Sequence, residues 1–266
     1  MDRVPVVNGL RGIAILGVML CHIAAGTVPP VGPYLSLLGN EIPLSPLITN
    51  GWTGVNLFFI LSGFVLYLPY AAGERRMADW GDGFAFYRRR CRRLLPLFYV
   101  AAIAVSALAA THGITWSWLT EVILLLTLAF TLTPSSFGPP FDVPLWSIGV
   151  EMMFSLFFPV IALRARGRAL ARWLWIVLVM ALALRVLGYL SHSTTAGMWL
   201  SYSTDNITCR LDEFVLGMML AKLYAEHRLP ERPTLFGIAG LVLVAAAWIG
   251  LDLSLHGVWP PVARAP

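Results

Sequence analysis

The chain has 266 residues, of which 58% are hydrophobic and only 12% charged, and its formal net charge is +5. A soluble domain would carry about 25% charged residues, so this composition excludes an ordinary soluble enzyme. The apolar residues are gathered into blocks of about 20 residues, the length that an α-helix needs to cross the hydrocarbon layer of a membrane. We therefore predict an all-α fold, a polytopic helical bundle embedded in a membrane.

The type of basic residue and the spacing of the cysteines narrow the class of protein further. Nearly all basic residues are arginines, with Lys222 as the one lysine. They gather between the apolar blocks, as the positive-inside rule requires of cytoplasmic loops, so we expect the lipid bilayer as a partner and no nucleic acid. The three cysteines, Cys21, Cys91 and Cys209, have neither paired nor metal-ligand spacing. We therefore expect no disulfide framework and no metal site.

Eight apolar segments follow one another along the chain, at residues 10–27, 54–72, 95–111, 118–133, 145–163, 173–190, 207–225 and 234–252. The first lacks the basic region, short apolar core and cleavage site of a signal peptide, so we predict a retained helix. Residues 28–53 hold no basic residue, whereas residues 73–94 hold seven arginines. The positive-inside rule then predicts a cytoplasmic N-terminus, an outer first loop and a cytoplasmic second loop.

Simple alternation of eight crossings conflicts with the charge of a later loop. If every segment crossed, the arginine-rich loop 164–172 would lie outside, against the positive-inside rule. Segment 118–133 is the shortest, contains Glu121 and is followed by the Pro- and Gly-rich stretch "TPSSFGPPFDVP". We predict that this segment enters the membrane and returns without crossing, which is tolerated where broken backbone is buried in protein. Loop 164–172 and the loop that follows Lys222 then become cytoplasmic, and residues 134–144 face outside.

Two titratable residues, Arg11 and His22, lie within the first apolar segment. At 100° per residue their spacing is three turns plus about 20°, so both project from one helix face, roughly 16 Å apart along the axis. Arg11 could reach the lipid headgroups and His22 could bond a neighbouring helix. Because ionisable groups inside a membrane usually line a cavity, their shared face favours a lined cavity.

The second and third segments add small and basic residues. In "NGWTGVNLFFILSGFVLY", three glycines permit close backbone approach, and Asn56 and Ser62 add polar groups; simple helix packing also explains most of this stretch. In "FYRRRCRRLLPLFY", five arginines precede Pro96, which suits the first turn of a helix. Guanidinium groups match phosphate geometry, so this cluster favours a phosphate-bearing ligand over a simple anchor for anionic lipids.

Two later helices carry buried charge. "PLWSIGVEMMFSLFFP" holds Glu151 in an otherwise apolar segment, where a carboxylate should be paired, protonated or functional. "CRLDEFVLGMMLA" holds Arg210, Asp212 and Glu213 near the predicted outer end of its helix. An ion-pair network and a role in substrate binding explain these three residues equally well.

Taken in order, five of these stretches resemble the membrane-bound acyltransferase family 3, the O-acyltransferases of surface glycans, lipids and some macrolides. The spacing of Arg11 and His22 matches the family's arginine, ten residues, histidine signature, and "GVNLFFILSGF" its glycine-rich second helix. "RRRCRRLLP" resembles its R-x-x-R motif and selects Arg90 and Arg93. "LWSIGVEMMF" and "RLDEFVLGMMLA" resemble its W-S-L-x-x-E-x-x-F-Y and R-x-x-E-F-x-x-G motifs.

The resemblance implies transfer of an acyl group, expected to be acetyl, from cytoplasmic acyl-CoA to a hydroxyl of a cell-surface carbohydrate or lipid-linked glycan, in the cytoplasmic (inner) membrane. A neutral imidazole can accept a proton near neutral pH, so His22 is the expected base or covalent acyl carrier. Arg11 is expected at the donor entrance, with Glu151 orienting the imidazole. The expected donor-binding residues are Arg89, Arg90 and Arg93, and those on the acceptor side or in a structural role are Asn56, Trp146, Ser147, Arg210 and Glu213. The acyl-CoA is a substrate, and no bound cofactor is expected.

The resemblance covers residues 4–252, with 253–266 as a C-terminal tail. Family members have further spans, so we expect this chain to lack the last helices. Ser155 and Met152 depart from the family motif, at positions where Tyr and a second acidic residue are usual. Three other functions stay open: a proton-coupled transporter, acylation of a small molecule such as a macrolide, and a non-catalytic partner in envelope assembly.

Overall fold

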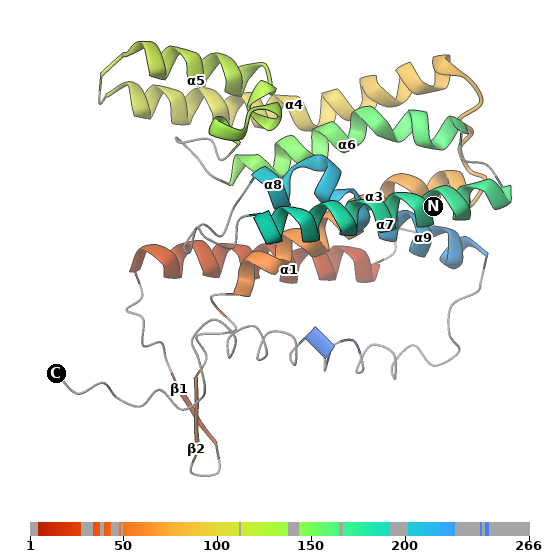
Figure 1. Ribbon diagram of the computed structural model, residues 1–266, viewed down its shortest axis with the longest axis horizontal. Helices are drawn as coiled ribbons and strands as arrows, with labels where there is room; N and C mark the ends of the chain where they lie inside the picture. Colours follow the sequence, from red (N-terminus) through yellow and green to blue (C-terminus); the bar gives the residue numbers. More distant parts are fainter. Residues whose placement is uncertain are drawn as a thin grey trace. The chain divides into compact units, whose positions relative to one another are not determined.

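Helices make up most of the described chain, which in this computed structural model comprises residues 5–27, 34–37, 40–43, 48, 50–111, 113–137, 144–164, 167–191, 202–226, 240 and 243–244. Figure 1 shows their order. The elements are α1 (Pro5–Thr27), β1 (Tyr34–Leu37), β2 (Asn40–Pro43), η1 (Asn50–Thr53), α3 (Gly54–Ala71), α4 (Trp80–Ala110), α5 (Trp116–Leu126), η2 (Ala129–Leu132), η3 (Pro134–Ser136), α6 (Leu145–Arg164), α7 (Gly167–Ser191), α8 (Tyr202–Asp205) and α9 (Ile207–Ala225).

Four stretches of the described chain are long and apolar enough to cross a membrane: Val6–Ile23, Asn50–Ala71, Trp80–Ala110 and Leu145–Leu163. Shorter apolar helices accompany them, which confirms the predicted helical membrane bundle. The expected segment 234–252 lies almost wholly outside the described residues. The stretch predicted as an outer loop contains an antiparallel hairpin, in which β1 pairs with β2.

The chain divides into two compact units, residues 1–58 with 227–266 and residues 59–226. In the first unit α1 packs directly on η1. A Cβ added to Gly51 would overlap the backbone carbonyl of Gly17, so the glycine permits the close helix approach that the sequence predicted.

Helix α4 begins earlier than predicted. We expected an apolar segment from residue 95 with Pro96 in its first turn, but the helix starts at Trp80 and Pro96 lies inside it. Asp79 and Asp82 fix the start: Asp79 Oδ1 accepts from the Asp82 amide at 3.1 Å, and Asp82 Oδ2 accepts from the Ala78 amide at 2.7 Å. Because this cap satisfies amides of the first turn and arginine favours helices, the basic stretch continues the helix instead of forming a loop.

Helices α4 and α6 run antiparallel in the second unit. The Phe86 ring stacks on Phe158 near the end of α6, with centroids 4.9 Å apart. Towards the other end of the pair, Phe98 shares a core cluster with Leu145, the first residue of α6. The basic beginning of α4 and the last residue of α6, Arg164, therefore lie at the same end of the bundle, as predicted for loop 164–172.

Helix α5 explains how the chain returns to that end. Its 11 residues are about 16 Å long, too short to cross about 30 Å of hydrocarbon. The helix folds back along α4 (Figure 1), where Trp118 Nε1 donates to the Ser106 carbonyl at 3.2 Å. The chain then changes direction at Leu128, whose φ of 62° lies in the left-handed region, and η2 follows. The length of α5 agrees with the prediction that segment 118–133 does not cross, and its return within the membrane stays a prediction.

Helix α9 packs against α3, α6 and α7. The Phe214 ring lies between Phe59 and Phe154, with centroid separations of 4.8 and 4.1 Å. A Cβ on Gly63 would overlap the Phe214 carbonyl, and one on Gly217 would overlap the backbone of α3. The glycines bring α3 and α9 into backbone contact, which fixes the helices that carry the polar clusters described next.

Candidate functional site

Glu151 is the point at which three helices of the second unit exchange hydrogen bonds. Its Oε1 accepts from Ser62 Oγ of α3 at 3.0 Å and pairs with Nη2 of Arg90 on α4. Arg90 Nε donates to Ser155 Oγ at 2.9 Å, and that hydroxyl donates to the Glu151 carbonyl at 2.9 Å. We call these four residues the Glu151 cluster. A buried arginine is costly unless its charge is paired and its donors are bonded; the cluster supplies the counter-charge and bonds two of the three guanidinium nitrogens of Arg90.

The helical repeat separates Arg90 from the arginines beside it. Arg90 shares the packed face of α4 with Phe86 and Phe98, and its side chain is 9% exposed. Arg89 and Arg93 point away from this face and are exposed. The three residues expected to grip CoA phosphates together are therefore in two environments: two are open to an outside ligand, and Arg90 already holds Glu151.

A partly open pocket of about 180 Å³ adjoins the Glu151 cluster. Its wall comes from α4, α6 and the turn after α5, and it is mainly apolar, with Leu94, Leu128 and Met152 among the lining residues. Arg90 and Ser155 supply charge and a hydroxyl at this wall. The pocket is thus almost wholly apolar, with the polar residues Arg90 and Ser155 among those that line it, and small-molecule sites are likewise lined mainly by apolar side chains with a few polar groups.

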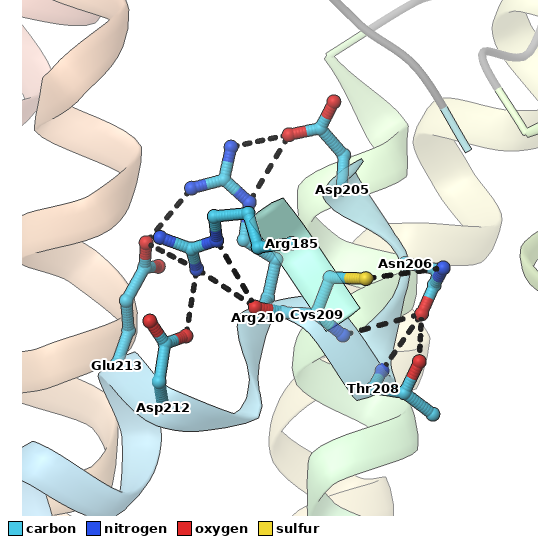
Figure 2. Close-up of polar contacts among 8 residues, drawn as sticks. All are labelled: Arg185, Asp205, Asn206, Thr208, Cys209, Arg210, Asp212 and Glu213. Carbon is cyan, nitrogen blue, oxygen red and sulfur yellow. Dashed lines mark hydrogen bonds and ion pairs between the residues drawn. The ribbon is translucent and has the colours of Figure 1, made fainter. Parts of the chain in front are cut away.

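A second polar cluster joins α7, α8 and α9 (Figure 2). Arg185 Nη2 contacts Asp212 Oδ1 at 2.6 Å and Glu213 Oε1 at 3.2 Å, and also donates to the Cys209 carbonyl at 2.8 Å. Arg210 Nη1 contacts Glu213 Oε1 at 2.8 Å, and its Nη2 pairs with Asp205. We call the five charged residues, Arg185, Asp205, Arg210, Asp212 and Glu213, the α7–α9 cluster.

This second cluster holds more negative than positive charge. Three carboxylates face two guanidinium groups, and Glu213 Oε2 is buried with no hydrogen-bond partner among the described residues. The guanidinium carbon of Arg210 also lies 5.8 Å from the centroid of the Trp146 ring, within the range of a cation–π contact. Three residues expected on the acceptor side, Trp146, Arg210 and Glu213, therefore meet at one place.

Arg11 and His22 lie in the first unit, on the packed stripe of α1. Val7, Ala14 and Cys21 are the buried residues of the helix within its described side chains, and Arg11 and His22 are half-buried beside them. The predicted shared face is confirmed. His22 Nδ1 lies 2.8 Å from the Val18 carbonyl oxygen, which can only accept, so Nδ1 carries the proton of the neutral ring and Nε2 carries the lone pair. The expected cooperation of His22 with Glu151 stays a prediction.

The remaining expected residues have local surroundings. Ser147 Oγ donates to the Pro144 carbonyl at 3.0 Å, at the start of α6, and Asn56 is half-buried in the first turn of α3. Sequence reasoning missed Arg185 and Asp205. The sequence could have identified Arg185, because it is a charged residue inside the apolar segment 173–190. The same signal identified Arg11.

The chain belongs to the Acyl_transf_3 family, described as an acyltransferase domain, which matches residues 4–264. It is 28% identical over 235 residues to acyltransferase MdmB of Streptomyces mycarofaciens, a match that covers 82% of this chain and 57% of that protein. It is 22% identical over 248 residues to O-acetyltransferase OatA of Staphylococcus aureus, covering 85% of this chain and 36% of that protein. The chain thus spans little more than half, or less, of these relatives' lengths. No solved structure matches it.

Proposed function

We propose that the protein is a membrane O-acyltransferase that moves an acetyl group from acetyl-CoA to a hydroxyl of a cell-surface carbohydrate or lipid-linked glycan. In this proposal it lies in the cytoplasmic membrane with its N-terminus inside the cell. Family membership and the relatives named as acyltransferase and O-acetyltransferase support the reaction class. The four apolar stretches of membrane-spanning length support the location.

The observation that carries the proposal is the hydrogen bond of His22. Nδ1 donates to the Val18 carbonyl, so the neutral tautomer has its lone pair on Nε2, the atom that a general base would use. In the proposed reaction, Nε2 takes the proton of the acceptor hydroxyl while its oxygen bonds to the thioester carbonyl carbon. The carbon–sulfur bond then breaks, and the thiolate of CoA takes the proton from the imidazolium. An ester and free CoA leave, with no net change in protons.

The arginines divide into two proposed roles. The exposed Arg89 and Arg93 bind donor phosphates, because guanidinium groups without a partner among the described residues offer the bidentate donors that phosphate accepts. Arg90 has Glu151 and Ser155 as partners, so its role in this proposal is to set the shape of the pocket beside it.

Replacement of His22 tests the function. His22→Ala should lower transfer of labelled acetyl groups from acetyl-CoA to membrane acceptors by about 10²–10⁴-fold, the usual contribution of a general base. Leu20→Ala, on the exposed face of the same helix, is the control and should transfer normally. CoA binding should persist in both variants. Wild-type transfer by His22→Ala would contradict the proposed role.

A proton-coupled transporter is the second candidate, favoured by the excess carboxylate of the α7–α9 cluster. Buried carboxyl groups in membrane helices often relay protons. A transporter would take up substrate in response to a pH gradient and would not consume acetyl-CoA, so the same labelled-acetyl assay separates the two functions.

A further inference from the structure

Arg90, which lines the pocket beside the Glu151 cluster, has one guanidinium nitrogen that the cluster does not use. Of the three guanidinium nitrogens of Arg90, Nε bonds Ser155 and Nη2 bonds Glu151. Nη1 has no hydrogen-bond partner among the described residues, and it is not among the buried unpartnered atoms either. Because Arg90 lines the pocket, this remaining N–H group can serve an oxygen atom of a molecule held there.

The rest of the pocket suits a short hydrocarbon chain. Leu94, Leu95, Leu128 and Met152 are among the residues that line it. An apolar cavity of about 150 Å³ can hold benzene, a molecule of six carbons, so the pocket's 180 Å³ fits a chain of about that size. A bilayer lipid tail, which fills about 15 Å of one leaflet, is longer than this pocket accommodates.

We propose that this pocket binds the acyl chain of the donor, with the thioester carbonyl oxygen accepting from Arg90 and up to about six carbons lying between α4 and α6. The inference rests on the proposed function, because it assumes an acyl-CoA donor, and it adds the class of acyl group. The pocket then accommodates acyl chains longer than the acetyl group of the proposed reaction, so donors that carry such chains bind more tightly than acetyl-CoA. The buried guanidinium, held in place by Glu151 and Ser155, is an oriented donor for a carbonyl.

Equilibrium binding of a donor series to the purified chain tests this assignment. The probes are CoA, acetyl-CoA, butyryl-CoA, hexanoyl-CoA and dodecanoyl-CoA. Burial of a methylene group favours binding about fourfold, so hexanoyl-CoA should bind about 15-fold more tightly than butyryl-CoA. Dodecanoyl-CoA should gain little more, because the pocket is full.

Two matched variants on α4 separate the pocket from the surrounding detergent. Leu94→Trp places a large ring in the pocket and should remove the gain from butyryl-CoA to hexanoyl-CoA. Leu97→Trp makes the same change on the outer face, where Leu97 is 74% exposed, and should retain the gain. Free CoA, which has no acyl chain, should bind both variants alike.

A measurement on the unmodified chain does not depend on the folding of a variant. Cys91 lines the pocket and is exposed, whereas Cys21 and Cys209 are buried. Hexanoyl-CoA should slow the reaction of Cys91 with a small thiol reagent several-fold more than CoA does. Equal protection by the two would overturn the inference.

The outcomes distinguish this inference from the proposed function. Affinity that is independent of chain length, or that rises up to dodecanoyl-CoA in both tryptophan variants alike, would overturn the pocket assignment and leave acetyl transfer standing; the second result would indicate partition into detergent or a lipid-tail site. Absence of CoA binding and of acetyl transfer would overturn both.

Discussion

The two polar clusters of the second unit stabilise their buried charges with different sets of partners. In the Glu151 cluster one arginine meets one glutamate, two serines complete the hydrogen bonds, and a pocket adjoins the arginine. In the α7–α9 cluster two arginines each contact two carboxylates, and one carboxylate oxygen is left without a partner among the described residues. The first arrangement leaves a donor for a ligand. The second uses its donors to hold helices together.

Removing an arginine from the α7–α9 cluster should have the largest effect on stability. Arg210→Ala removes the arginine that pairs with Asp205 and Glu213 and raises the excess of negative charge. Breaking a buried pair costs about 3–5 kcal/mol, so we expect a strong fall in the unfolding midpoint in detergent. Arg92→Ala, at an exposed position, is the control. Equal midpoints for the two variants would show that this cluster does not stabilise the fold.

The Glu151 cluster should tolerate loss of both charges better than loss of one. Glu151→Leu leaves Arg90 buried without a counter-charge and should cost about 3 kcal/mol, towards the lower end for a broken buried pair because the guanidinium can turn to the pocket. Adding Arg90→Met should recover most of that stability, as apolar replacements of buried pairs do. Hexanoyl-CoA should bind the double variant more weakly than the unmodified chain, because the variant lacks the Arg90 guanidinium. A double variant as unstable as Glu151→Leu would contradict this account.

The exposed arginines should affect the donor and leave stability unchanged. Arg93→Ala should raise the KM for acetyl-CoA by about 10- to 150-fold, because a charge-assisted bond to phosphate contributes about 1.5–3 kcal/mol. Lysine should recover part of this loss, since it lacks the bidentate fork. Arg89 should behave in the same way. An unchanged KM in the alanine variants would favour binding of anionic lipid headgroups instead.

Neutralising Glu213, whose Oε2 has no hydrogen-bond partner among the described residues, should have the smallest effect. Glu213→Gln keeps an oxygen for Arg185 and Arg210, and it brings the cluster to zero net charge. The midpoint change should correspond to less than about 1.5 kcal/mol, the scale of one net hydrogen bond. Glu213→Ala, which leaves both arginines short of an acceptor, should cost more. A loss for glutamine as large as for alanine would show that the second oxygen has a partner of its own.

The sequence predicted features that depend on local pattern. Helix positions followed from apolar blocks, and the common end of Arg164 and the α4 arginines followed from charge alone. The pairing of Arg90 with Glu151 could not be predicted, because the two residues are 61 positions apart and their contact depends on how α4 packs against α6. The contacts of Arg185 with α9 could not be predicted for the same reason, because they depend on how two helices pack. The start of α4 was wrong because arginines were assigned to a loop by charge, although their helix propensity and the Asp79 cap favour helix.

The length of α4 has a consequence at the membrane surface. Its 31 residues extend about 46 Å, more than the roughly 30 Å of the hydrocarbon layer, so one end projects among the headgroups. There the exposed Arg88, Arg89, Arg92 and Arg93 meet the negative surface potential of anionic lipids, which attracts each basic residue by about 1 kcal/mol. If Arg89 and Arg93 bind the phosphorylated donor as proposed, lipid phosphates compete with it for the same side chains. In that case donor affinity depends on the leaflet composition and the ionic strength as well as on the chain.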